Sequence, residues 1–182
     1  MTIQSNQALI EYMADHSVKF IHFWGHQPPK NGVSKSCFSQ WFNAEFTDGE
    51  HQFATAEHFM MYHKAMLFGN DDIAANILAS RHPNEAKQWG RKVRHFDEAK
   101  WNAQRFDIVV KGNLLKFSQH SDLKRFLLQT DQRILVEASP VDNIWGIGLA
   151  ADNEHSEHPE HWRGLNLLGY ALMQVREQLR AE

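Results

Sequence analysis

Residues 97–117 carry the sequence DEAKWNAQRFDIVVKGNLLKF, and this stretch decides the fold class. Apolar side chains recur along it at helical spacing, among them Trp101, Ile108 and Leu115. Asp97 precedes the apolar pattern, in the position of a helix cap. We therefore expect one long helix from Glu98 to about residue 117.

Helical signals continue on both sides of this stretch. Thr55 is a residue type that caps helices, and Gly69 followed by Asn70 is typical of a helix end. A helix is therefore expected from Thr55 to about Phe68. Further helices are predicted over residues 71–79, 83–93, 122–129 and 165–180.

Strand signals are shorter and more scattered. β-branched and aromatic residues predict a strand at residues 18–24, and residues 133–138 alternate weakly. The aromatic-rich residues 37–46 are expected to form another strand, with residues 50–54 returning as its hairpin partner. The sequence therefore predicts an α+β fold that is mainly α-helical. Its small β-sheet combines the N-terminal third with residues 133–138.

Composition excludes several classes of protein. The 182 residues are 42% hydrophobic and 23% charged, which fits one globular domain. A formal net charge of -3 argues against a broad basic face for duplex nucleic acid, although a few local cations can still hold a small phosphorylated ligand. Cys37 is the single cysteine, which excludes an internal disulfide, and we expect it to be a buried, inert thiol. Neither a signal peptide nor a transmembrane span is apparent, so we expect a cytoplasmic protein without a membrane partner.

The first candidate site lies at the start of the helix expected after Thr55. Glu57, Met61 and Lys64 share one face of that helix. A glutamate among apolar neighbours can have a raised pKa and act as a general acid or base, and Lys64 can reach an anion such as a phosphate. The alternative is a solvated first-turn acid that complements the helix dipole, with an ordinary surface lysine.

The second candidate site is the turn-rich loop over residues 139–148. Trp145 can stack on a base while Asp142 orients a sugar or a water molecule, or the loop can be structural with its indole in the core. Asn166 opens the last helix, where it can bind a ligand oxygen or simply cap the helix.

Two polar clusters have a plainer interpretation. His155, His158 and His161 alternate with glutamates in a polar loop, and their spacing outside a helix favours a solvated loop over a zinc site. Lys87 and Arg91, with Arg94, would line one helical face that is either solvated or in contact with phosphate or nucleic acid.

Taken together and in order, these segments resemble the YbiA-like NADAR family. The matching pieces are the strand ending near Phe23, residues 37–46, residues 54–59 with Lys64, residues 83–90, Trp101, residues 134–137, residues 142–146 and residues 166–169. The resemblance spans about residues 18–178 and implies a single YbiA-like domain over residues 1–182. The chain departs from the family pattern at residues 24–35 and in the histidine-rich loop.

The resemblance implies an N-glycosidase, a hydrolase of phosphorylated ribosylaminopyrimidines, which are early riboflavin-pathway intermediates. Two alternatives are a hydrolase that removes ADP-ribose from guanine in nucleic acid, and a non-catalytic module that binds ADP-ribose or a nucleotide. The net charge favours a small substrate over nucleic acid. Glu57 and Asp142 are the expected catalytic residues, and no metal or organic cofactor is expected. The expected substrate-binding residues are Trp24, Trp41, His58, Lys64, Trp145 and Asn166.

Overall fold

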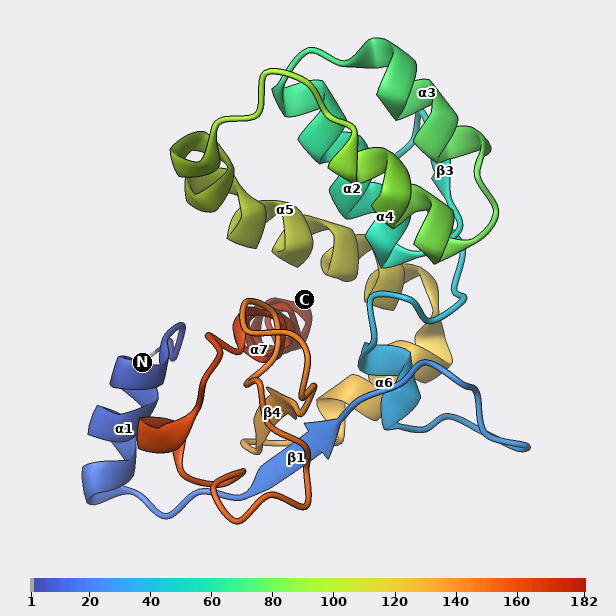
Figure 1. The fold of residues 1–182 in the computed structure, drawn as a ribbon. Helices are drawn as coiled ribbons and strands as arrows, with labels where there is room; N and C mark the ends of the chain where they lie inside the picture. The colour runs from blue at the N-terminus through green and yellow to red at the C-terminus, as the bar shows by residue number, and fades with distance from the viewer. Residues whose placement is uncertain (1) are drawn as a thin grey trace.

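One long helix, α5 (Glu98–Gln119), runs through the middle of the computed structural model, which describes residues 2–182 (Figure 1). It packs against α2 (Ala56–Leu67) on one side and α7 (Leu167–Arg180) on the other. The helix expected from Glu98 is therefore confirmed, and it divides the molecule into two halves.

Three helices form the first half. They are α2, α3 (Asp71–Ala79) and α4 (Pro83–Arg91), which pack against one another. Thr55 caps α2 as predicted, because its Oγ1 accepts a hydrogen bond from the His58 backbone N–H at 3.3 Å. Local capping signals therefore located this half correctly.

Two short strands lie in the second half, next to α7 (Figure 1). β1 (Phe20–Phe23) pairs in parallel with β4 (Ile134–Glu137), and Phe23 is the partner of Glu137. The prediction that an early and a late segment share a sheet is therefore confirmed. The last residue of β4, Glu137, faces residues of α2 and α4 at the boundary between the two halves.

A second pair of strands is antiparallel and very short. β2 (Phe46–Thr47) pairs with β3 (Gln52–Phe53), so the hairpin partner expected within residues 50–54 does form. Elsewhere, residues 37–46 were expected to be a strand, and most of that prediction is wrong. The segment begins in a 3₁₀ helix, η1 (Lys35–Phe38), and continues through turns.

The physical reason for this difference is a buried lysine on α5. Lys116 is fully buried and its Nζ donates to the Cys37 carbonyl at 2.6 Å and to the Ser39 carbonyl at 3.1 Å. The ammonium group satisfies these two backbone oxygens, which a neighbouring strand would otherwise have to bind. Sequence periodicity does not reveal a partner that lies so far along the chain.

The remaining elements close the second half. The N-terminal helix α1 (Asn6–Asp15) was not predicted, although Ser5 caps it and Leu9 is fully buried. α6 (Ser121–Leu128) follows α5, and η2 (Pro159–His161) lies within the segment expected to be a loop.

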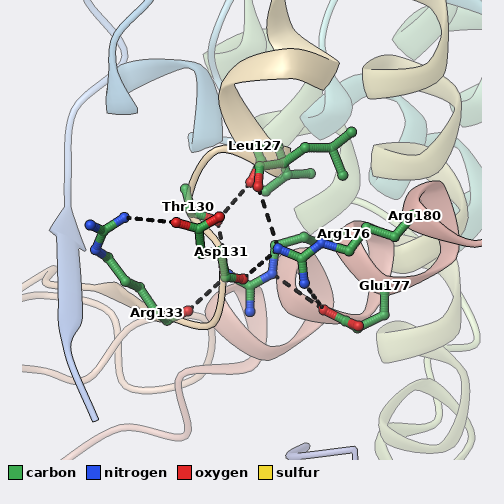
Figure 2. A network of polar contacts seen from close by, with 8 residues as sticks. Leu127, Thr130, Asp131, Arg133, Arg176, Glu177 and Arg180 are labelled. Atoms are coloured by element: carbon green, nitrogen blue, oxygen red, sulfur yellow. Dashed lines mark hydrogen bonds and ion pairs between the residues drawn. The ribbon is translucent and has the colours of Figure 1, made fainter.

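A buried arginine ties α7 to the segment between α6 and β4 (Figure 2). Arg176 donates through Nη1 to Thr130 Oγ1 and to the Arg133 carbonyl, both at 2.8 Å. Thr130 in turn donates to the Leu127 carbonyl at 2.6 Å. These bonds fix the start of β4 against α7 and hence the place where β4 ends.

Aromatic side chains supply much of the core on both sides of α5. The ring centroid of Phe59 lies 5.0 Å from that of Phe53 and 5.8 Å from that of Phe46. The ring centroids of Phe38 and Phe23 are 5.4 Å apart. Within residues 2–182 no helix has both the length and the apolar character needed to cross a membrane.

Candidate active site

A cavity of about 230 Å³ lies where the first half of the fold meets the end of β4. Its walls come from the segment after η1, from α2 and α4, from the end of β4 and from the loop that follows. Its charged and aromatic residues are three carboxyl groups, three cations and two indoles: Glu57, Glu137, Asp142, Lys64, Lys87, Arg91, Trp41 and Trp145. Five of these eight residues belong to the set expected from the sequence.

Glu57 is the most deeply buried of the three carboxyl groups in the cavity. It is the second residue of α2, only 5% exposed, and its backbone N–H donates to the Gln40 carbonyl at 3.0 Å. Burial raises the pKa of Glu57 to about 7, Lys87 and Lys64 oppose the rise, and Asp142 adds to it. The solvated first-turn acid considered above is therefore excluded. The group can change its protonation state near neutral pH, as a general acid or base must.

Glu137 is a second perturbed carboxyl group, and sequence reasoning gave it no role. It is the last residue of β4, and its Oε2 is buried without a hydrogen-bonding partner among residues 2–182. Burial raises the pKa of Glu137 to about 8, Asp142 and Glu57 add to the rise, and Lys87 opposes it. The one sequence feature that could have pointed to Glu137 is that it is an acid at the end of an otherwise apolar strand, Ile134–Glu137.

Asp142 shapes the loop that covers the end of β4. Its Oδ1 accepts hydrogen bonds from the backbone N–H groups of Ile144 at 2.9 Å and Trp145 at 2.8 Å. This turn holds the Trp145 indole at the cavity, half-buried. Gly146 follows, and a Cβ there would lie 2.9 Å from the Glu137 carbonyl oxygen. The loop therefore rests directly on the strand that carries Glu137.

The cations of the cavity come from two helices. Lys64 is one turn before the end of α2, and α4 contributes Lys87 and Arg91, four residues apart. The pKa of Lys64 is lowered by burial, Glu57 opposes this shift and Arg91 adds to it. Arg94, predicted on the same helical face, instead pairs with Asp72 at 2.7 Å. The cavity therefore combines carboxyl groups with cations. The cations suit an anionic group of a ligand, and the carboxyl groups suit a bond whose cleavage requires proton transfer.

Three expected substrate-binding residues do not line this cavity. The side chain of Trp24 is 60% exposed and lies outside the cavity. His58 is buried and bonds through Nδ1 to Thr55 Oγ1 at 2.7 Å and through Nε2 to the Ser80 carbonyl at 3.1 Å. Asn166 is fully buried, and its amide bonds to the backbone of β4. The last two side chains use their polar atoms to join elements of the fold.

The histidine-rich loop lies outside the cavity as well. The imidazole centroids of His155 and His161 are 4.4 Å apart, and that of His158 lies more than 6 Å from both, at 6.2 and 6.3 Å. Within the described part of the chain, no group of three or more histidine, cysteine or acidic side chains could hold a metal ion. Cys37 is buried as expected, and burial raises the pKa of its thiol to about 12.

Known proteins resemble this chain in both sequence and structure. The family model for the NADAR domain matches residues 22–180, from β1 to the end of α7, and so includes the whole cavity. N-glycosidase R617 of Acanthamoeba polyphaga mimivirus is 42% identical over 165 residues, which are 88% of this chain and 96% of R617. The chloroplastic riboflavin biosynthesis protein PYRR of Zea mays is 33% identical over 132 residues, which are 69% of this chain and 19% of PYRR.

A solved structure agrees with these matches. The NMR structure of the E. coli protein YbiA has a TM-score of 0.71 at 25% sequence identity, and the match covers 91% of this chain and 88% of YbiA. In sequence, N-glycosidase YbiA of Escherichia coli K12 is 32% identical over 128 residues, which are 70% of this chain and 71% of YbiA. The structural match therefore extends over both halves of the fold.

Proposed function

This chain belongs to the NADAR domain family, and we propose that it hydrolyses the N-glycosidic bond of phosphorylated ribosylaminopyrimidines. The resemblance inferred from the ordered motifs is confirmed by the family match, and the relatives named N-glycosidases make the chain an enzyme acting on N-glycosyl bonds. Similarity to a riboflavin biosynthesis protein supports the substrate class. The observation that carries the proposal is the buried Glu57, which has a pKa of about 7 in a cavity that also holds three cations.

The carboxyl groups suit this reaction. Breaking an N-glycosidic bond passes through a state in which the sugar carries positive charge, so a nearby carboxylate stabilises it and can activate the attacking water. Glu57 takes this role because it sits on a rigid helix and ionises near neutral pH. Asp142 orients the ribose through Oδ2, because Oδ1 is already bonded to the backbone of its own loop.

The other cavity residues match the remaining parts of the substrate. Lys64, Lys87 and Arg91 can bind the 5′-phosphate, since their charges lie on one pair of helices. The indoles of Trp41 and Trp145 offer flat apolar surfaces to the pyrimidine ring.

The proposal is tested by parallel incubations with ribosylaminopyrimidine 5′-phosphates and with ADP-ribosylated DNA. We expect ribose 5-phosphate to be released from the first substrate. Release of ADP-ribose from the DNA alone would replace this function with hydrolysis at nucleic acid. Absence of both products, together with calorimetric binding of ADP-ribose, would indicate a non-catalytic module.

Lys64→Ala is expected to raise KM about tenfold or more with little change in kcat. The lysine would bind the phosphate equally in the ground state and the transition state, and loss of such binding appears in KM; a hydrogen bond to a charged group is worth about 1.5–3 kcal/mol. Steady-state kinetics provide the measurement. Lys111→Ala, an exposed lysine on α5, is the control. A collapse of kcat at unchanged KM would assign Lys64 to the chemistry instead.

Treatment with EDTA is expected to leave turnover unchanged. Carboxyl groups alone can supply the proton transfers that this hydrolysis requires. The measurement is the rate before and after chelation and gel filtration. Loss of activity that zinc restores would contradict the expectation and would direct attention to His155, His158 and His161.

A further inference from the structure

We propose that Glu137 is the general acid of this site and that its carboxyl group protonates the departing amine. The inference deepens the proposed function and rests on it. Three observations support it: the way β4 is held, the surroundings of the carboxyl group, and the division of protonation states between two neighbouring acids.

The backbone of Glu137 is held from two directions by segments outside the sheet. Its N–H donates to Asn166 Oδ1 at 3.0 Å, and its carbonyl accepts from the Ile147 N–H at 2.9 Å. Asn166 also donates through Nδ2 to the Leu135 carbonyl at 3.0 Å. Asn166 adopts a left-handed conformation (φ 52°) at the start of α7, which brings its amide to the strand. A catalytic side chain needs this kind of rigid support.

Two glycines permit this arrangement. A Cβ at Gly146 would crowd the Glu137 carbonyl oxygen, and a Cβ at Gly169 would collide with the Leu135 carbonyl oxygen and the Asn166 amide. The motifs around residues 142–146 and 166–169 therefore meet at the end of β4. Together they fix the position of Glu137. This structural role accounts for Asn166 without any contact between Asn166 and a ligand.

The carboxyl group of Glu137 has an oxygen atom, Oε2, to which no described protein group forms a hydrogen bond. Glu137 lines the cavity, and its Oε2 is buried. An unsatisfied buried polar atom is costly, so its retention is best explained by a partner on the substrate. The charged groups around it are Glu57 on α2, Asp142 on the loop, and the cavity cations Lys64, Lys87 and Arg91.

These neighbours divide the roles. Acidic groups that share a buried site do not all ionise together, so one retains its proton while another is charged. Burial and the nearby Asp142 and Glu57 raise the pKa of Glu137 to about 8, whereas that of Glu57 is raised to about 7. Two lysines, Lys87 and Lys64, oppose the rise at Glu57, whereas only Lys87 opposes it at Glu137, so Glu137 keeps an O–H to donate and Glu57 is the available base.

The step is balanced without any further reactant. As the bond between C1 and the amine nitrogen breaks, its electron pair stays on nitrogen, which takes the proton from Glu137. Water attacks C1 and gives a proton to Glu57, so the products are ribose phosphate and the free amine. Proton transfer through solvent from Glu57 to Glu137 restores the starting state.

The test compares Glu137→Gln with Glu157→Gln, an exposed acid in the loop after Gly148. On a ribosylaminopyrimidine 5′-phosphate, Glu137→Gln should lose at least about 100-fold in kcat, and Glu157→Gln should lose nothing. On p-nitrophenyl riboside 5-phosphate, whose leaving group departs without a proton, Glu137→Gln should recover nearly all of the wild-type rate. Glu57→Gln should remain impaired on both substrates, because water must be activated in each case.

The pH dependence provides a second readout. For the wild type, kcat/KM on the amine substrate should rise through about pH 7 as Glu57 ionises and fall through about pH 8 as Glu137 loses its proton. The falling limb should be absent from the residual activity of Glu137→Gln.

A stability measurement needs no substrate. The raised pKa means that the folded state binds the Glu137 proton more tightly than the unfolded state does. The wild type therefore loses stability as pH rises from the ordinary glutamate range through about 8, and Glu137→Gln lacks this loss. The melting temperature of the variant should thus increase relative to wild type between pH 5 and pH 9.

The outcomes separate the two proposals. Wild-type protein that cleaves neither riboside would overturn the proposed function. Active wild-type protein with an equally active Glu137→Gln, or a Glu137→Gln defect of the same size on both substrates, would overturn the assignment of Glu137 and leave the proposed function standing.

Discussion

Replacing Glu57 with glutamine is expected to lower kcat at least about 100-fold while the protein remains folded. General acid–base groups typically contribute about 10²–10⁴-fold, and glutamine keeps the shape of the side chain while removing its charge and its exchangeable acid proton. The side chain is buried on α2 with a pKa raised to about 7, so an uncharged replacement does not create a new unpaired charge. The measurement is kcat on the ribosylaminopyrimidine phosphate, with circular dichroism to verify the fold.

Two further variants show whether the effect belongs to this position. Glu98→Gln is the matched control, because Glu98 is also a first-turn glutamate but is exposed at the start of α5. Asp142→Asn should also lose rate, with a larger share of its effect in KM if Asp142 chiefly orients the ribose. A near-wild-type kcat for Glu57→Gln would remove Glu57 from the mechanism and assign the chemistry to Asp142.

Gly169→Ala is expected to destabilise the protein by about 2 kcal/mol, the upper end of the usual overpacking cost less the helix-propensity gain of alanine. The new methyl group would collide with the Leu135 carbonyl oxygen and the Asn166 amide, and neither can move without separating α7 from β4. Overpacking of a well-packed core typically costs about 1–3 kcal/mol and occasionally more. The higher helix propensity of alanine returns only about 1 kcal/mol. Urea unfolding followed by circular dichroism measures the difference.

Gly90→Ala is the matched comparison for this prediction. Gly90 is also a buried glycine in a helix, but an added methyl group there would meet the side chain of Met61. Methionine is unbranched and adapts readily, so the free energy of unfolding should change by less than about 1 kcal/mol. Equal losses of stability in the two variants would show that the close contact between α7 and β4 is not what requires Gly169.

The helices from α2 onward could be predicted because their signals are local. Thr55 and Asp97 cap helices through hydrogen bonds to residues three positions along the chain, His58 and Lys100, so the residue types and their spacing are enough. The shared face of Glu57 and Lys64 follows from helical geometry in the same way. Both side chains do line the cavity.

The segment over residues 37–46 could not be predicted in this way. Its aromatic composition favours a strand, yet its carbonyl groups bond to Lys116, which lies about 80 residues further along the chain, with separations of 79 and 77 residues. No local pattern encodes that partner, and tertiary contacts override strand propensity in such cases. The same folded segment brings Trp41 to the cavity.

The sequence by itself determined the helices that follow Thr55, that an early and a late strand share a sheet, and that Glu57 and Lys64 face the same way. Only the tertiary structure decided that Glu137 joins Glu57 and Asp142 in one cavity, because these residues lie on three separate elements. It also decided that Asn166 serves the strand, since both of its bonds reach about 30 residues back, with separations of 29 and 31. Burial shifts the pKa values of Glu57 and Glu137, and burial depends on how distant segments pack.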